Sequence, residues 1–394
     1  MKKFSLTSLP IRHNRISAAV LLVLVAACFL YLRGVFTSMW ERDTIYPGEG
    51  VTRQTMLSEW LPSLEGTAGD TPVYFLEGEE EGGTILVLGG THANEPSGVV
   101  SAIYLVENCK PRQGTLIVIP QANAIGFTCT DAQEAAPMTY TIEGENGTRT
   151  LRYGSRAGNV IYQWPDPDIY VRKAADGQTL SGAETRNLNR TYPGVADGTI
   201  TEQISYAITT LIQQEKVDIT VDLHEASPEY QTINTIVAHE DAMNLAAEAK
   251  MWLEDEVPIN IDVSAPNLHG LTHRELGDYT DTLALLMETS NAAQGRLHGA
   301  TSSELVVTGQ DKYYVRARNS GDGTYGRLYV EYTEEGHPLS ERAARHLSYI
   351  VEFANDANFV DDSILPIDLG DMPSYQELCD GLYDALVDAQ YKNA

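Results

Sequence analysis

Short apolar runs alternate with amphipathic stretches along most of this 394-residue chain, and the alternation limits the folds available to it. Five runs have the length and β-branched content of strands: 84–90, 114–123, 217–226, 283–290 and 327–332. Helical periodicity begins near Ser97, covers 201–216 and begins again near Ser340. Strands separated by helices predict an α/β fold with a mixed, mostly parallel central sheet and helices on both faces.

The N-terminus has a basic leader followed by a long uncharged segment. Residues 1–15 carry four Lys or Arg side chains and no acidic side chain, and residues 16–32 carry no charge. A segment of this length is near the lower limit for a helix that crosses a bilayer, and basic residues in front of it favour a cytoplasmic N-terminus. We therefore expect a single-pass anchor in the cell membrane, with the rest of the chain outside the cytoplasm.

Two other fates of this segment are compatible with the sequence. It also fits a signal peptide that is cleaved during export, although no small-residue cleavage site follows the apolar core. The stretch VAAC (25–28) resembles a bacterial lipobox, which would make Cys28 a lipidated N-terminus, but the apolar FLYL that follows is unusual for a mature lipoprotein. All three alternatives place the bulk of the chain outside the cytoplasm.

The charge balance and the cysteines exclude several classes of protein. With 55 acidic and 27 basic residues, the net charge is −28. Such a surface repels phosphate backbones, so we expect no binding to nucleic acid, and no sequence feature predicts a protein partner. The four cysteines form no CxxC pair, so neither a disulfide framework nor a cysteine-ligated metal is expected.

The remaining segments complete the expected domain organisation. We expect a cytoplasmic N-terminus, the anchor, a stalk, a folded domain and a C-terminal helical tail over residues 1–15, 16–32, 33–70, 71–360 and 361–394. Within the folded domain, residues 124–185 are rich in Gly, Asp and Thr and show little periodicity. Long segments of this kind inside compact domains are usually functional, so an insertion beside a binding site is expected there.

Four polar side chains lie at the ends of predicted strands. His92 and Glu95 occupy a tight turn, His224 ends an apolar strand and Glu288 follows five apolar residues. Each feature alone also fits an ordinary turn, a hydrogen-bonded histidine or a structural ion pair. Together they match a zinc site, because two histidines and one carboxylate leave a fourth position for water. Burial of Glu288 without a partner is costly, so its position indicates either a role or a charged partner.

Four motifs carry a resemblance to a known family. GGTHANEPSG (89–98), VIPQANAIGF (118–127), NLNRTYPG (187–194) and DLHEA (222–226) together resemble the succinylglutamate desuccinylase/aspartoacylase family, a branch of the zinc carboxypeptidase superfamily. The resemblance extends from about residue 72 to 335. It implies a zinc carboxypeptidase-like fold and one Zn2+ ion held by His92, Glu95 and His224.

The resemblance also implies roles for other residues. Asn189 and Arg190 match a pair that binds a substrate carboxylate, a task that suits the planar guanidinium group. Glu288 matches the glutamate that takes a proton from the hydrolytic water, with Glu331 as the rival base. Arg186, the nearest arginine upstream of Asn189 and Arg190, is expected to polarise the scissile carbonyl.

The expected activity is zinc-dependent hydrolysis of an amide bond in an N-acyl amino acid or short peptide that bears a carboxylate. METSN (287–291) departs from the Glu-Val-Gly-Pro of the acylase branch and is similar to a carboxypeptidase context, so the sequence leaves deacylase and carboxypeptidase activities open. Two further alternatives remain: hydrolysis of an ester bond, as in a deacetylase with the same zinc site, and a catalytically inactive binding protein on this fold.

Overall fold

The structure, a computed structural model, describes residues 11–131, 135–172, 178–320 and 328–392. The chain divides into two compact units, Met1–Arg42 and Asp43–Ala394. The first contains helix α1 (Ile11–Ser38). With a mean hydropathy of 2.4 over its apolar window, α1 is long and apolar enough to cross a membrane, a property that signal sequences share.

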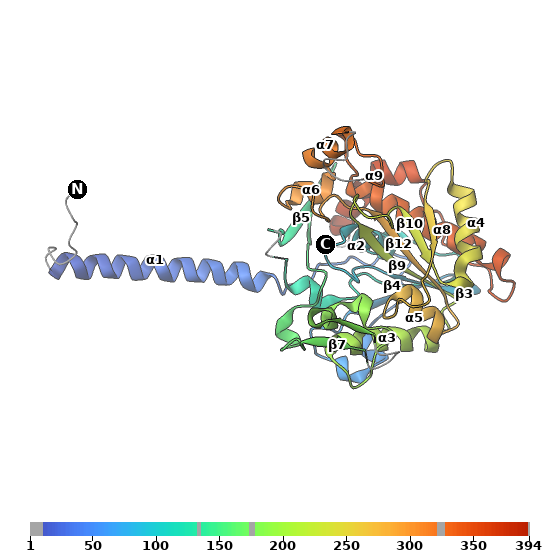
Figure 1. Ribbon diagram of the computed structural model, residues 1–394, viewed down its shortest axis with the longest axis horizontal. Coiled ribbons are helices and arrows are strands. Elements are labelled where there is room, and N and C mark those ends of the chain that lie inside the picture. The colour runs from blue at the N-terminus through green and yellow to red at the C-terminus, as the bar shows by residue number, and fades with distance from the viewer. Residues whose placement is uncertain (1–10, 132–134, 173–177, 321–327, 393–394) are drawn as a thin grey trace. The chain divides into compact units, whose positions relative to one another are not determined.

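The second unit is built around an eight-stranded sheet (Figure 1). In spatial order its strands are β1 (Arg53–Met56), β2 (Pro72–Glu77), β4 (Gln113–Ile119), β3 (Glu80–Leu88), β9 (Ile219–Ala226), β12 (Leu283–Ser290), β10 (Thr235–Ala238) and β11 (Asn260–Val263). The central strands β4, β3, β9 and β12 are parallel, whereas β1, β2 and β10 each pair antiparallel with a neighbour. The predicted mixed, mostly parallel sheet is confirmed.

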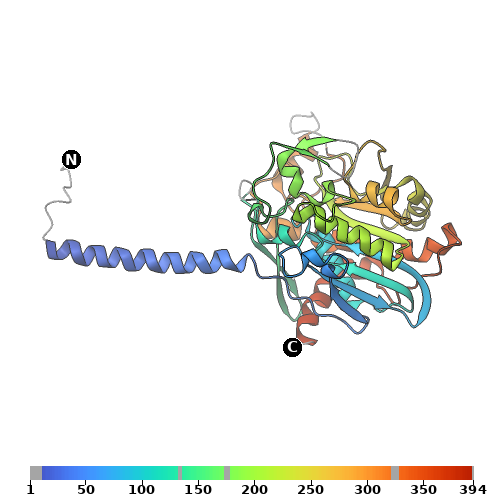
Figure 2. The same cartoon turned by 90° about the horizontal axis from the view of Figure 1, so that it is seen from below.

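Helices cover both faces of this sheet. One face packs against α2 (Pro96–Asn108), α4 (Met243–Leu253), α8 (Leu339–Val360) and α9 (Tyr375–Lys392), and the other against α3 (Ile200–Glu215) and α5 (Thr272–Tyr279). Figure 2 shows α3, the yellow-green helix, crossing in front of the sheet. Every residue of β9 is buried because this central strand has a hydrophobic core on each side. Its β-branched residues and alternating pattern made it recognisable in the sequence.

The insertion at 124–185 contains two small hairpins in its described parts. They are β5 (Thr139–Gly144) with β6 (Gly147–Arg152), and β7 (Ile169–Val171) with β8 (Thr179–Ser181). Two short 3-10 helices follow, η7 (Gly182–Arg186) and η8 (Leu188–Arg190). After β12 come α6 (Ser303–Thr308) and α7 (Lys312–Ser320). These segments lie outside the main sheet.

The structure differs from the expected stalk. Residues 33–70 are divided between the units, since α1 continues to Ser38 and the second unit begins at Asp43. β1 pairs with β2, and the apolar side chains of Leu57 and Trp60 are buried beside it, so this region belongs to the folded body. The C-terminal α9 likewise packs its leucines into the core of the same unit.

The expected strand at 327–332 is absent from its described part, residues 328–332. Tyr329 N donates to Pro228 O (3.0 Å), but this bond is not continued into a ladder. Tyr332 instead turns into the core and packs against Tyr314, with 5.1 Å between ring centroids. Its aromatic side chain is therefore buried without strand pairing.

Candidate metal centre

The turn between β3 and α2 brings His92 and Glu95 to the carboxyl edge of the sheet. Gly90 has a φ of +65°, which a side chain would strain. A Cβ on Gly89 would lie 2.7 Å from Gly98 O, so only glycine lets the chain leave the strand here. Pro96 then starts α2, a position where proline fits because no helical N–H is needed.

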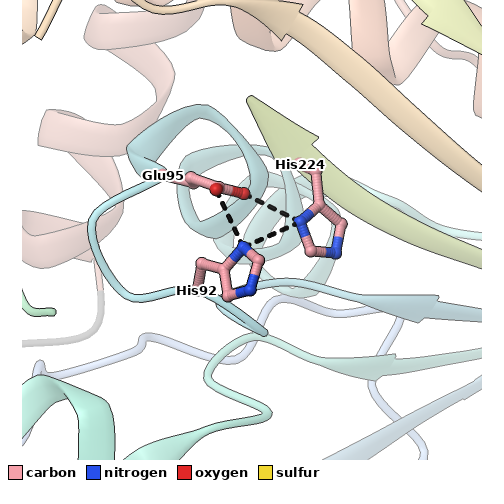
Figure 3. A group of neighbouring side chains, drawn as sticks. All are labelled: His92, Glu95 and His224. Atoms are coloured by element: carbon pink, nitrogen blue, oxygen red, sulfur yellow. Dashed lines mark hydrogen bonds and ion pairs between the residues drawn. The ribbon is translucent and has the colours of Figure 1, made fainter. Parts of the chain in front are cut away.

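His92, Glu95 and His224 converge at this edge (Figure 3). His92 Nδ1 lies 2.8 Å from Glu95 Oε1, and His224 Nδ1 lies 2.8 Å from Glu95 Oε2. The two Nδ1 atoms are 3.1 Å apart. All three side chains are buried, and they come from a turn, a helix start and a central strand. The structure thus brings together the three residues that the sequence analysis proposed as zinc ligands.

The outer ring nitrogens of both histidines have oxygen acceptors. His92 Nε2 donates to Asn187 Oδ1 (2.9 Å), and His224 Nε2 donates to Asp222 Oδ2 (2.8 Å). The orientation of the Asn187 amide is fixed, because its Nδ2 donates to Glu184 Oε2 (2.8 Å). Neutral imidazole protonated at Nε2 presents its lone pair at Nδ1. Each histidine is therefore held with Nδ1 directed toward the other two side chains.

This donor set fits a cation. Two imidazole lone pairs and a carboxylate face one another at 2.8–3.1 Å and repel unless positive charge lies between them. Ligand atoms about 2.0–2.2 Å from one tetrahedral zinc ion lie about 3.3–3.5 Å apart, close to this spacing. Without a cation, a proton on His224 serves the same purpose. Burial disfavours that charge, but the carboxylates of Asp222 and Glu95 outweigh burial and raise the pKa of His224 well above its usual value.

The pKa values of His92 and Glu95 agree with a site that attracts positive charge. Burial, with the nearby charge of Arg156, lowers the pKa of His92 to about 4, so this imidazole is neutral near pH 7. Burial alone would raise the pKa of Glu95, but the two histidines outweigh it and hold that pKa well below the usual value. Glu95 is therefore an anion, and its negative charge remains beside the two imidazoles.

Asp222 supports His224 from behind and is itself fully bonded. Its Oδ1 accepts from Thr91 Oγ1 (2.7 Å), and its Oδ2 accepts from Thr272 Oγ1 (2.7 Å) as well as from the histidine. A buried carboxylate with three donors is held in one orientation. Asp222 therefore fixes the orientation of the His224 ring.

Glu288 lies on β12 next to His224, which is its register partner on β9. It lines the same cavity as His92 and Glu95, and its Oε2 has no hydrogen-bond partner among the described residues. Burial, opposed by His224 and reinforced by Glu95, raises the pKa of Glu288 to about 8. The rival, Glu331, lies outside this cavity with its side chain 91% exposed and is paired with Arg318.

The cavity has a volume of about 670 Å³, within the range that holds small ligands. Asn189 and Arg190 line it as expected, and Asn189 Oδ1 accepts from the backbone N–H of Thr272 (2.9 Å). Burial and the charge of Arg156 lower the pKa of Arg190 from its usual value. The Arg190 guanidinium thus lies where a bound anion would be favourable.

Arg186 is not brought into this cavity, in contrast to the sequence-based expectation. Its guanidinium is paired with Asp166 at 2.7 and 2.9 Å and also donates to Gly158 O (2.6 Å). Arg156 lines the cavity instead, with Nη1 3.8 Å from Glu95 Oε1. Sequence reasoning missed Arg156 because it lies in the insertion, where neither periodicity nor a motif marks it.

Gln294 is a second residue that the sequence analysis did not identify. Its Nε2 donates to Glu95 Oε1 (3.2 Å), and the residue lines the cavity. The loop that carries it comes close to Ser227, because a Cβ on Gly295 would lie 2.1 Å from Ser227 Oγ. Tyr230 and Tyr329 also contribute to the lining.

No family model and no curated protein matches the sequence. Several solved structures are similar. A succinylglutamate desuccinylase/aspartoacylase from Rhodobacter sphaeroides has 18% identity and a TM-score of 0.35, covering 58% of this chain and 54% of that chain. The product-bound ectoine utilization protein EutE (DoeB) from Ruegeria pomeroyi has 16% identity and a TM-score of 0.41, covering 77% and 63%.

The tripeptide-bound cell shape determinant Csd4 from Helicobacter pylori has 12% identity and a TM-score of 0.45, covering 80% of this chain and 59% of that chain. The chain therefore spans 54% to 63% of the length of these three solved proteins. One of these solved proteins, that from Rhodobacter sphaeroides, carries the name of the family that the motifs of the present chain resemble.

Proposed function

We propose that the second unit is a zinc-dependent hydrolase that cleaves an amide bond in a small molecule or short peptide bearing a carboxylate. The observation that carries this proposal is the convergence of His92, Glu95 and His224 at a cavity that also exposes Glu288 and Arg190. Metal-type donors, a carboxylate without a hydrogen-bond partner on one oxygen, and a guanidinium in one cavity are the parts that amide hydrolysis needs.

The metal ligands would be the Nδ1 atoms of His92 and His224 and the carboxylate of Glu95. A zinc ion bound there supplies Lewis acidity, which lowers the pKa of a bound water toward neutrality and polarises a carbonyl. Asn187 and Asp222 keep the two imidazoles in the tautomer that ligation requires, and Gln294 holds the Glu95 carboxylate.

Glu288 is the proposed general base and acid. Its carboxylate takes a proton from the attacking water, and it later returns this proton to the nitrogen that leaves when the C–N bond breaks. A group that both accepts and donates a proton works best when its pKa lies near the working pH. Burial raises the pKa of Glu288 to about 8, which is close to neutrality.

The arginines have two proposed tasks. Arg190, with Asn189 beside it, binds the substrate carboxylate, because a partly buried guanidinium offers a planar fork of donors. Arg156 takes the task expected of Arg186: it lies 3.8 Å from Glu95, where it stabilises negative charge on the reacting carbonyl oxygen.

Helix α1 is the proposed membrane anchor, with the hydrolase outside the cytoplasm. The proposal rests on the length and hydropathy of Asn14–Ser38 and on the basic residues that precede it. Protease added to intact cells should digest the second unit while the protein fractionates with membranes. Recovery of a soluble form that starts beyond α1 would indicate a cleaved signal, and a lipid on Cys28 would indicate a lipoprotein.

Metal analysis and two glutamate variants test the activity. The purified full chain should contain one zinc ion, and removing it with a chelator should abolish hydrolysis of N-acyl amino acids or peptides until zinc is restored. Glu288→Gln should retain zinc but lose about 10²–10⁴-fold in kcat. Glu331→Gln is the matched control and should retain activity, because its side chain is exposed outside the cavity.

Three outcomes would contradict the proposal in different ways. Full activity of the metal-free protein would refute metal dependence, and full activity of Glu288→Gln would refute the assignment of the base. Hydrolysis confined to acetyl esters would show an esterase at the same site. Bound zinc without turnover of any amide or ester would indicate a binding protein.

A further inference from the structure

The cavity has two chemically different halves. The half next to the metal-type donors carries the charged side chains of Arg156, Arg190 and Glu288. The other, which we call the apolar half, is lined by Val237, Val263, Ala265, Leu268, Leu271 and Leu286. An apolar lining beside a few convergent polar groups is typical of a site that binds an organic side chain.

The floor of the apolar half continues directly from the proposed base. Leu286 lies two residues before Glu288 on β12, so both side chains point to the same face of the sheet. Val237 on β10 is the register partner of Leu286 and shares that face. Their side chains are only 2% and 8% exposed, so they form a firm floor.

The wall of the apolar half is fixed to the carboxylate-binding segment. Gly270 has a φ of +88°, and a Cβ there would lie 2.4 Å from Arg190 O. The loop carrying Leu268 and Leu271 therefore packs against the Arg190 backbone, and Thr272 N reinforces it by donating to the neighbouring Asn189. A substrate whose carboxylate is bound by Arg190 has the apolar half as its immediate neighbour.

The apolar half offers no cationic side chain to an acidic group. Among the described residues that line the cavity, the arginines belong to the charged half, and His273 is neutral because burial lowers its pKa to about 3. Asp262 lies beside Val237 in register on β11 and adds negative charge. A carboxylate entering here would lose hydration without gaining a positively charged partner among the described residues of the apolar half.

We propose that the residue whose carboxylate is bound by Arg190 has an apolar side chain, as in N-acyl-leucine, N-acyl-phenylalanine or a peptide ending in such a residue, rather than an acidic one. The inference rests on the proposed function, which places that carboxylate at Arg190. It narrows the substrate class through Val237, Leu268, Leu271 and Leu286, which determine the specificity.

Binding measurements test the apolar half separately from turnover. N-acetyl-leucine and N-acetyl-aspartate are titrated calorimetrically into the zinc-loaded full chain carrying Glu288→Gln, which prevents hydrolysis from obscuring binding. We expect N-acetyl-leucine to bind at least about 10-fold more tightly, the lower end of the discrimination that apolar pockets achieve. Hydrolysis of both compounds is then measured with the unaltered protein.

A charge placed in the apolar half provides the matched comparison. Leu268 is 41% exposed at the rim, so Leu268→Arg disturbs the core little and should reduce or reverse the preference for N-acetyl-leucine. Leu365→Arg is the control: this leucine is 54% exposed, lies outside the cavity lining and should leave the preference unchanged.

The outcomes separate the two proposals. Equal or tighter binding of N-acetyl-aspartate by the protein without a charge at position 268, or binding of neither compound to the zinc-loaded chain, would overturn the apolar assignment. A preference unaffected by Leu268→Arg would overturn it as well. Selective binding of N-acetyl-leucine without hydrolysis would support the apolar half while refuting the amide hydrolase.

Discussion

Replacing Asp222 separates two contributions to the proposed metal centre, the acceptor behind His224 and the charge on that acceptor. Asp222 accepts from His224 Nε2, Thr272 Oγ1 and Thr91 Oγ1 at 2.7–2.8 Å. In Asp222→Asn the amide oxygen can still face His224 and Thr272, while its NH2 donates to Thr91, whose hydroxyl can turn to accept. The acceptor is kept and the charge is lost.

The site itself offers a precedent for a neutral acceptor, because His92 is already supported by the amide of Asn187. We therefore expect Asp222→Asn to weaken zinc binding by about 10-fold, or about 1.4 kcal/mol. Asp222→Ala also removes the acceptor, so the imidazole no longer keeps its lone pair at Nδ1, and the loss should reach about 100-fold, or about 2.7 kcal/mol.

Competition with a chromophoric chelator at fixed pH measures these affinities. Asp262→Asn is the control, because it removes a carboxylate from the exposed side of the same cavity and leaves the donors untouched. Wild-type affinity in both Asp222 variants would refute the idea that the outer nitrogen of His224 needs an acceptor. Equal losses in the two variants would show that charge alone matters.

Three further predictions address the arginines, the backbone and pH. Arg156→Ala should lower kcat by about 10²–10³-fold while Arg186→Ala retains kcat, and the reverse order in steady-state kinetics would restore the sequence-based assignment. Gly270→Ala should lower the free energy of unfolding by at least about 1 kcal/mol, measured in urea, because its φ is +88°; an unchanged midpoint would contradict the strain. Despite burial, the hydrogen bond and charge of His337, together with Arg345, lower the pKa of Glu341 from 4.5 to about 2. This depressed pKa stabilises the fold above about pH 4.5, and the gain is lost as the pH falls toward 2, so Glu341→Gln should cost about 2 kcal/mol at pH 7 and progressively less in acid. A cost independent of pH would refute this linkage.

The central strands and the candidate ligands they carry were predictable from the sequence because their signals are local. His224 lies near the end of a strand rich in β-branched residues, and Glu288 follows five apolar residues in another strand, so their positions toward the carboxyl edge follow from the fold class alone. His92 and Glu95 are three residues apart and need only a tight turn to meet. The convergence of all three donors required the parallel pairing of β3 with β9, which the alternation of strands and helices implies.

The arginines and the edge strands were less predictable because they depend on contacts between distant segments. Arg156 and Arg186 are both in regions without periodicity. Only tertiary packing determines that Arg186 pairs with Asp166 whereas Arg156 lines the cavity. β1 has four residues and one neighbouring strand, so its pattern is too short to distinguish it from a linker. The burial of Leu57 and Trp60, which attaches this region to the folded body, depends on their contacts beside the sheet and could not be read from the local sequence.

The short segment that carries Glu184, Asn187 and Arg190 serves both ends of the proposed reaction. Asn187 Oδ1 accepts from the ring of His92, and three residues later Arg190 lines the cavity where it would bind the carboxylate of the proposed substrate. The spacing between the proposed metal centre and the proposed carboxylate-binding group is thus set within a single turn of backbone. Lengthening or shortening this turn would displace Asn187 and Arg190 together. A redesign toward longer or shorter substrates therefore has to change other parts of the cavity lining.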